Sequence, residues 1–172
     1  MNQDQNTELK FKPVGSRLKG VGGWLAFFII GQLILRPIAT WNELNDPHNI
    51  SPSQIETTFP MTANIIRVER ALSIGLFLFG MLVALTLWKI RTPVSVKLAK
   101  IYLVANAVVF ILDAFAYKLS DIPVDAQNEI MRRSLTSAVA VTIMCIIWFQ
   151  YFTKSERVKA TYYDDIAPLG LP

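Results

Sequence analysis

Four apolar runs, each long enough to cross a lipid bilayer, constrain this chain more than any other feature. They occupy residues 22–39, 71–90, 99–117 and 135–152. A membrane-spanning helix needs about 20 mostly apolar residues to cross about 30 Å of hydrocarbon. The apolar residues are bunched into these runs rather than spread at the period of an amphipathic helix or strand. The runs therefore predict an all-α, polytopic membrane protein, folded as an antiparallel four-helix transmembrane bundle.

Composition and chain length agree with this prediction. Hydrophobic residues make up 52% of the 172 residues and charged residues only 17%, against about 25% charged in an average soluble domain. The chain outside the runs is divided among two tails, two outer connections and one tight inner turn, so we expect no separate soluble domain. We expect a cytoplasmic tail over 1–21, a bundle over 22–153 with spans at about 22–40, 69–90, 98–118 and 134–153, and a second cytoplasmic tail over 154–172.

Basic residues gather on one side of the predicted bundle. The first tail, the turn between the second and third runs, and the last tail hold eleven of the seventeen Lys and Arg residues. Because loops rich in Lys and Arg stay on the cytoplasmic side of a membrane, both termini are predicted to be cytoplasmic. The pI of about 9.3 does not indicate nucleic acid as a partner, since the basic residues flank apolar runs and form no groove with interleaved aromatics.

No motif for catalysis, a metal or a cofactor stands out in the sequence. The glycines at 20–23 follow no strand and precede no Gly-Lys-Ser/Thr, so we interpret them as a hinge before an interfacial Trp24 rather than a phosphate loop. His48 is the only histidine and has no companion ligands in its loop. Cys145 lies inside the fourth run with no histidine near it. We therefore expect no catalytic residues, no metal and no cofactor.

Polar residues inside the runs are the candidate site. The third run carries Asn106 and Asp113, and the first carries Gln32 and Arg36, four residues apart and so on one helix face. Arg36 lies thirteen residues after Gly23, and Asp113 thirteen after the basic residue at 100. At ~1.5 Å per residue both lie about 20 Å above the cytoplasmic boundary, in the outer third of the bilayer.

Because a charge at this depth is costly, it should face protein and have a partner. We therefore predict that Arg36 and Asp113 pair across the bundle, with Gln32 and Asn106 supplying hydrogen bonds deeper in the membrane. The alternative for Arg36 is that it extends to the outer headgroups. A further set of charges is expected at the outer boundary: Glu69, Arg70, Arg132 and Arg133.

Two other patterns predict packing. Ala71 with Gly75, and Gly80 with Ala84, are pairs of small residues four apart, which let helix backbones approach closely. The aromatic residues from 148 to 152 are typical of an aromatic belt at the membrane interface.

Two short motifs lie at the ends of the runs that we place in the cytoplasm. One begins the first run and the other follows the fourth: Gly22, Gly23 and Trp24, then Tyr151, Phe152, Ser155, Arg157 and Thr161. In these motifs the chain resembles a bacterial inner-membrane family of four-span proteins known only as domain of unknown function 2569. The likeness covers nearly the whole chain in layout. It implies the four-span fold and a location in the bacterial inner membrane, and it implies no activity.

Three classes of function compete for such a chain. The first is a non-catalytic structural or interaction subunit of a membrane complex, with another membrane protein or a second copy as partner and the lipid bilayer around both. The second is a small oligomeric carrier or proton-linked transport element that uses Asp113 as its ionisable group. The third, an intramembrane enzyme, lacks a nucleophile with a base. The sequence favours the first class.

Overall fold

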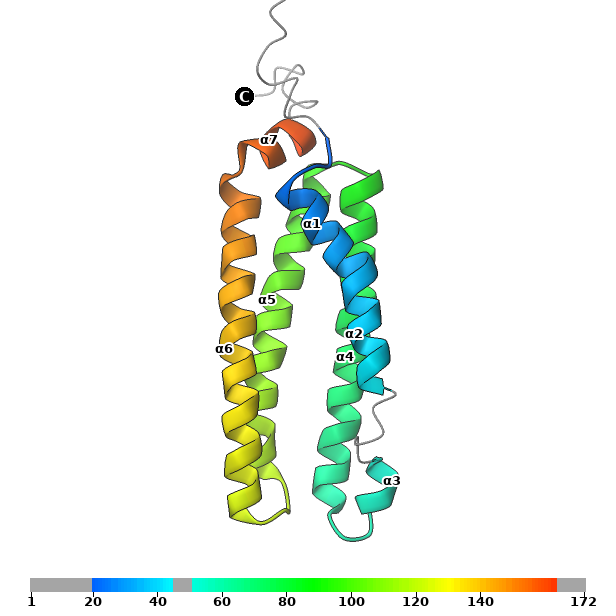
Figure 1. The fold of residues 1–172 in the computed structure, drawn as a ribbon, viewed down its shortest axis with the longest axis vertical. Coiled ribbons are helices and arrows are strands. Elements are labelled where there is room, and N and C mark those ends of the chain that lie inside the picture. Colours follow the sequence, from blue (N-terminus) through cyan, green and yellow to red (C-terminus); the bar gives the residue numbers. More distant parts are fainter. Residues whose placement is uncertain (1–19, 45–50, 164–172) are drawn as a thin grey trace, which may run out of the picture.

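The computed structural model describes residues 20–44 and 51–163 as an all-α bundle (Figure 1). Four helices are long and apolar enough to cross a membrane. The first runs from Trp24 to Leu44 and is called here the first helix; its parts are α1 (Trp24–Ile30), the π-helical η2 (Gly31–Leu35) and α2 (Arg36–Leu44). The others are α4 (Pro60–Lys89), α5 (Pro93–Ala116) and α6 (Val124–Lys154). The fold class predicted from the sequence is confirmed.

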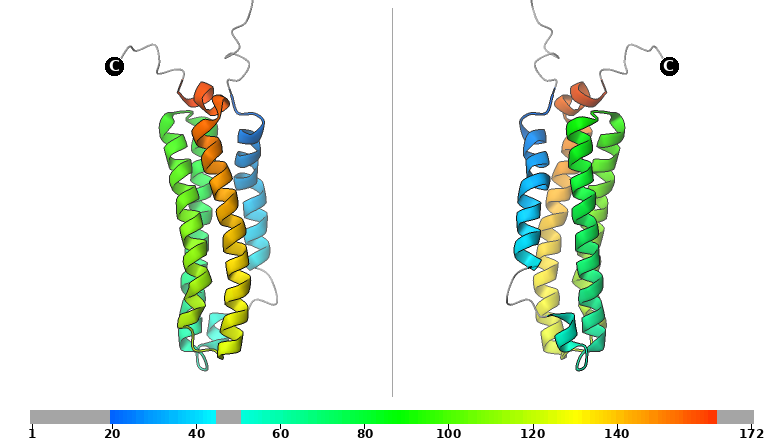
Figure 2. Two further views of the ribbon diagram at one scale, coloured as in Figure 1. Left: turned by 90° about the vertical axis from the view of Figure 1, so that its left-hand side faces the viewer. Right: turned by 90° about the vertical axis from the view of Figure 1, so that its right-hand side faces the viewer.

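Three short elements lie at the ends of the bundle. They are α3 (Pro52–Ile55), the 3₁₀ turn η3 (Tyr117–Leu119) and α7 (Glu156–Tyr162). Figures 1 and 2 show α7 across one end of the bundle and α3 beside the other. We call these the α7 end and the α3 end.

The first helix continues through Pro37 because its backbone widens just before the proline. Pro37 has no N–H to donate, and in a regular α-helix its ring would clash with the carbonyl of Leu33. In η2 the N–H of Arg36 donates to the carbonyl of Gly31, five residues earlier. This π-helical segment gives the ring room and resets the face on which Arg36 lies.

The four long helices form two neighbouring pairs. Helices α5 and α6 pack together along their length, while the first helix packs mainly against α4. In Figure 1 the two pairs lie close together at the α7 end and diverge toward the α3 end. The main cluster of buried apolar side chains follows this shape: its fully buried members include Leu25, Leu87, Val96, Tyr102 and Val158, which lie near the α7 end.

Helix α7 closes the packed end because of its sequence pattern. Ser155 leaves the helical conformation and ends α6, and its Oγ then accepts a hydrogen bond from the N–H of Val158. Val158 and Tyr162, four residues apart, are both buried against the bundle. The Tyr162 hydroxyl also donates to the carbonyl of Leu87 at 2.7 Å, where the last turn of α4 leaves carbonyls without helical partners.

The opposite end of α4 is capped by a residue far away in the sequence. The Asp121 carboxylate, in the connection between η3 and α6, accepts hydrogen bonds from the N–H groups of Met61 (2.9 Å) and Thr62 (3.0 Å) and from the Thr62 hydroxyl. An acidic group is favoured at a helix N-terminus, where N–H groups lack helical partners. This contact joins α4 to the α5–α6 pair at the α3 end.

One of the two predicted small-residue contacts is present in the structure and the other is not. Gly80 and Ala84 are buried in α4, and a Cβ added at Gly80 would lie 2.7 Å from Gln32 Oε1 and 3.0 Å from the Tyr102 hydroxyl. A side chain at position 80 would therefore displace the ends of Gln32 and Tyr102, and glycine leaves room for both beside α4. Ala71 and Gly75 instead face open space. Spacing alone could not show which pair packs against another helix, because the residues of both pairs are four positions apart.

The predicted aromatic belt is wrong for two of its members. Trp148 and Phe152 are buried, with 9% and 2% of their surfaces exposed. Trp148 lies at the centre of an aromatic cluster, 4.9 Å from Phe28 and 6.0 Å from Trp24 between ring centroids. The cluster packs the first helix against α6 near the α7 end. Trp24 is 67% exposed, as an interfacial anchor would be.

Candidate functional site

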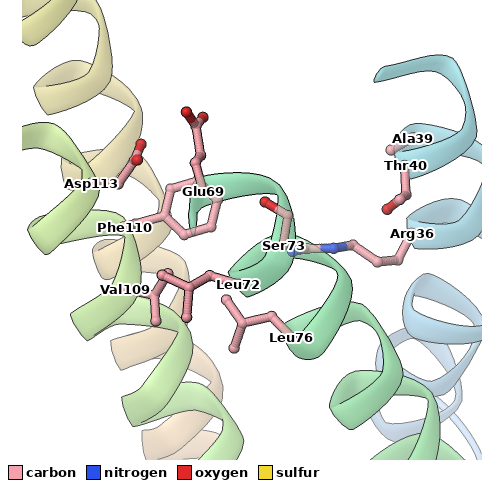
Figure 3. A pocket seen from close by; sticks show the side chains of 10 residues that line it. All are labelled: Arg36, Ala39, Thr40, Glu69, Leu72, Ser73, Leu76, Val109, Phe110 and Asp113. Carbon is pink, nitrogen blue, oxygen red and sulfur yellow. The ribbon is translucent and has the colours of Figure 1, made fainter. Parts of the chain in front are cut away.

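The charged residues predicted inside the membrane meet at one cavity. Its volume is about 190 Å³, and it lies between α2, α4 and α5. Arg36 lines it from the first helix, Glu69 and Ser73 from α4, and Asp113 from α5 (Figure 3). The depths counted along the two predicted spans thus placed Arg36 and Asp113 at the same level.

Figure 3 shows how the two charges lie around this cavity. The Arg36 side chain extends toward α4 and overlaps Ser73 in this view, while Asp113 lies on the α5 side, beyond Phe110. The predicted pairing of Arg36 with Asp113 therefore remains a prediction, to be tested by the coupling between them. Glu69, expected at the outer boundary, lines the cavity as well and accepts a hydrogen bond from the Tyr117 hydroxyl at 2.9 Å.

A second cavity lies on the other side of Arg36. It has a volume of about 300 Å³ between the first helix, α5 and α6, and its polar lining includes Gln32, Arg36 and Asn106. The Tyr102 hydroxyl donates to Gln32 Oε1 at 3.0 Å. Asn106 is 7% exposed and its Nδ2 donates to Cys145 Sγ at 3.6 Å, which leaves its Oδ1 without a hydrogen-bond partner in the described part of the chain.

All four residues of the predicted intramembrane cluster therefore line cavities that share Arg36. Two residues were not among the predicted site residues: Tyr102, which shares a helix face with Asn106 and donates to Gln32, and Ser73, which lines the 190 Å³ cavity with Arg36. Tyr102 lies one helical turn from Asn106 on α5, so its spacing was the available signal. Ser73 had no such signal.

The other predicted boundary charges do not reach these cavities. Arg132 and Arg133 both pair with Glu129 on the same helix, at 3.0 and 2.7 Å. These pairs are exposed, and the i,i+3 and i,i+4 spacing could have indicated them from the sequence. Arg70 follows Glu69 on α4 and is half-buried.

A groove between α4 and α5 lies toward the α3 end. Its volume is about 500 Å³, and we call it the α4–α5 groove. Its lining is apolar except for Asn64 and two carboxylates: Met61, Asn64, Ile65, Val68, Glu69, Leu72, Val109, Leu112, Asp113, Ala116 and Leu119. Two of the charged residues that line the 190 Å³ cavity, Glu69 and Asp113, therefore also form part of this outward-facing groove.

The two terminal motifs singled out in the sequence meet at the α7 end. The backbone N–H of Gly20 donates to Thr161 Oγ1 at 3.2 Å. A Cβ at Gly22 would lie 2.8 Å from an Arg157 guanidinium nitrogen, so a side chain there would displace Arg157. Gly23 precedes α1 with a φ of 57°, in the left-handed region that favours glycine.

The second motif is built around α7. Ser155 begins this helix, Phe152 is buried at the end of α6, and Tyr151 is partly buried next to it, 5.8 Å away between ring centroids. The motifs thus join the entry of the first helix to the exit of the last. Their residues hold structure, and none of them faces the Arg36 cavities.

Within residues 20–44 and 51–163, no group of three or more His, Cys, Asp and Glu side chains could hold a metal ion. His48, discussed above as a lone histidine, lies outside the described residues. Cys145 is buried beside Asn106.

Comparison with known proteins yields one family match. A family model described as "Protein of unknown function (DUF2569)" matches residues 18–163. No curated protein and no solved structure matches the chain significantly.

Proposed function

This chain belongs to the DUF2569 family of proteins of unknown function, and we propose that it is a non-catalytic interaction subunit that binds a helix of another membrane protein or of a second copy. It is a membrane protein with four bilayer-length helices. Each step of the proposal rests on the α4–α5 groove.

The groove is open to the outside of the bundle and long enough to follow α4 and α5 over several turns. Its lining runs from Met61 to Leu72 on α4 and from Val109 to Ala116 on α5, and its volume of about 500 Å³ exceeds that of the cavities beside Arg36. Its walls carry exposed apolar side chains, among them Leu112, which is 63% exposed. Such side chains can pack against a partner helix as well as against lipid.

Charge gives the groove a preference among partners. Glu69 and Asp113 line it from opposite helices. Carboxylates at membrane depth are costly unless they are matched, and a basic side chain on a partner helix would match them. A Lys or Arg in a transmembrane segment of the partner, or in a second copy of this chain, is the complement we propose.

For location we propose the bacterial inner membrane with both termini in the cytoplasm. The Gly20–Thr161 hydrogen bond supports one element of this proposal, because it brings the first and last described helices to the same end of the bundle. The excess of basic residues near that end supports its assignment to the cytoplasm. Reporter fusions at Asn49 and after Thr161 test the orientation: a cytoplasmic signal at Asn49 would contradict it.

The decisive experiment for the groove is site-specific photo-crosslinking in native membranes. A photoreactive residue replaces Leu112, in the groove, and in a matched control it replaces Ile146, which is 56% exposed on α6 and does not line the groove. We expect a discrete protein adduct from position 112 that Asp113→Asn weakens, and none from position 146. Mass spectrometry of the adduct separates a second copy from another protein. The same adducts from both positions would overturn the proposal.

A carrier or proton-linked transport element is the second candidate. The observation that favours it is the 190 Å³ cavity, where Arg36, Glu69 and Asp113 meet from three helices. Vesicles containing the purified protein would then show proton or substrate flux that Asp113→Asn abolishes while Glu129→Gln, on an exposed pair of α6, leaves it unchanged. Absence of flux under an imposed proton gradient counts against this candidate.

A further inference from the structure

A slot beside the first helix is distinct from the α4–α5 groove. It consists of the 300 Å³ cavity described above and a second hollow of about 290 Å³, both of which are lined by Phe28, Gln32, Arg36 and Trp148. We call these two hollows the Arg36 slot. It lies between the first helix and α6, two elements that the bundle does not pack closely toward the α3 end.

The slot has a positive character. Among residues 20–44 and 51–163, Arg36 is the only charged residue in the lining of either hollow. No hydrogen bond or ion pair joins its guanidinium to another residue of the described chain. Acids line the cavity on the α4 side of Arg36 but not the slot. A cation at membrane depth favours an anion beside it, and the described residues that line the slot supply none.

Hydrogen-bonding groups lie beside this cation. Gln32 uses its Oε1 to accept from Tyr102, so its amide nitrogen remains a donor. Asn106 is almost fully buried; its Nδ2 donates to Cys145, and its unused Oδ1 is an acceptor, so this residue offers no donor to an anion. An anionic oxygen beside Arg36 and Gln32 would accept hydrogen bonds from a guanidinium and from an amide nitrogen. The geometry of a guanidinium group matches phosphate oxygens in particular.

The remainder of the slot is apolar. Phe28 and Trp148 line both hollows, Met144 lines one and Leu35 the other. A flexible acyl or isoprenoid chain is narrower than a helix and meets apolar walls.

We propose that the Arg36 slot binds a phosphate-bearing anionic lipid, with the phosphate at Arg36 and Gln32 and one hydrocarbon chain between the first helix and α6. The bilayer supplies such lipids laterally. A free phosphate ion shares the headgroup's chemistry but lacks a chain for the apolar walls, and the experiment below separates the two.

Gly31 offers a way to block the slot without crowding the protein. It lies in η2 and lines the slot, and a Cβ added there meets nothing within 4 Å. Gly75 in α4 is equally open but lines neither hollow. Gly31→Leu and Gly75→Leu are therefore a matched pair: the same change, in a membrane helix, inside and outside the slot.

The test is lipid titration of the purified full-length protein in detergent, with phosphatidylglycerol and phosphatidylcholine in parallel arms and bound lipid counted by native mass spectrometry. We expect wild type to bind phosphatidylglycerol about tenfold more tightly, as charge-assisted hydrogen bonds allow. Arg36→Gln should remove this preference and Arg36→Lys should retain most of it. Gly31→Leu should weaken binding of both lipids, and Gly75→Leu should behave as wild type.

Several outcomes would overturn the proposal. They are equal binding of the two lipids by wild type, unchanged lipid binding in Gly31→Leu, and displacement of phosphatidylglycerol by millimolar inorganic phosphate, which would assign the site to a free anion. Far-UV circular dichroism shows whether each variant is folded. If Arg36→Gln does not fold, the difference in lipid binding between Gly31→Leu and Gly75→Leu still tests the proposal. The slot and the groove have no lining residue in common, so failure of the photo-crosslinking experiment does not affect this result.

Discussion

The two ends of this bundle are built differently, although the same four helices form both. At the α7 end, large apolar and aromatic side chains from every long helix interlock beneath α7, and Gly80 lets Gln32 and Tyr102 approach. At the α3 end the helix pairs diverge, cavities remain, and charged side chains line them. The comparison teaches that tight packing is concentrated at one end of the bundle: the α7 end holds the helices together, whereas hollows with charged and apolar linings remain toward the α3 end.

The largest expected difference comes from the same truncation at each end of α4. Leu87 is fully buried at the α7 end, whereas Leu72 is 44% exposed and lines hollows at the α3 end. Leu87→Ala should lower the free energy of unfolding by about 2–5 kcal/mol because it leaves a cavity in a packed core. Leu72→Ala should cost well under half of that. Unfolding in mixed micelles measures the free energy of unfolding of both variants. Equal decreases would show that the two ends do not differ in packing.

The next test adds atoms instead of removing them. Gly80→Ala places a methyl group against Gln32 and Tyr102, and should cost about 1–3 kcal/mol through overpacking and loss of their hydrogen bond. Gly75→Ala meets open space and should be neutral or stabilising by up to about 1 kcal/mol, since alanine favours the helix. The same unfolding measurement applies. A destabilising Gly75→Ala would mean that the α3 half of α4 is more tightly packed than the structure shows.

The next prediction concerns the interaction free energy between Arg36 and Asp113, which shows whether charges at the open α3 end stabilise the bundle. If the two charges pair as their common depth predicts, the double variant Arg36→Ala/Asp113→Ala should differ from the sum of the single variants by about 0.5–3 kcal/mol. Arg36→Ala combined with Glu129→Ala is the control, because Glu129 pairs with Arg132 and Arg133, and this combination should be additive. Additivity in both cases would remove the predicted pair.

The smallest effect concerns pH and is confined to the first turn of α4. Desolvation raises the pKa of Asp121, but the hydrogen bonds from Thr62 and Met61 outweigh it and hold the pKa below its usual value. A lowered pKa in the folded state means that the stabilisation is present above about pH 4, the unfolded value, and is lost as the pH falls through the folded value.

Hydrogen exchange of the amides of Met61 and Thr62 measures this local effect. In wild type, exchange of these two amides should become faster in acid than exchange in the rest of α4. In Asp121→Ala it should be fast at every pH. The α7 end should show no such step. An exchange rate at Met61 that is independent of pH in wild type would contradict the assigned cap.

The sequence by itself determined the class of fold, the presence of four membrane-length helices and the polar residues worth attention, although α4 and α6 begin nine and ten residues before the predicted spans. The physical reason is that bilayer thickness imposes a length and a polarity that can be read in one dimension. Depth can be counted in the same way, which is why Arg36 and Asp113 were expected at one level and line one cavity. The terminal glycine and aromatic motifs likewise indicated the family.

Only the tertiary structure decided which faces meet. It buried Trp148 and Phe152 where a belt was expected, used Gly80 but not Gly75 for close packing, and directed Arg36 toward α4. It also separated the packed α7 end from the open α3 end. The rotation of each helix about its axis depends on how side chains from different helices fit together, and the π-helical turn before Pro37 changes that rotation locally. Apolar side chains can pack against lipid or against another helix, so the pattern of apolar residues could not show which of the two covers each side chain.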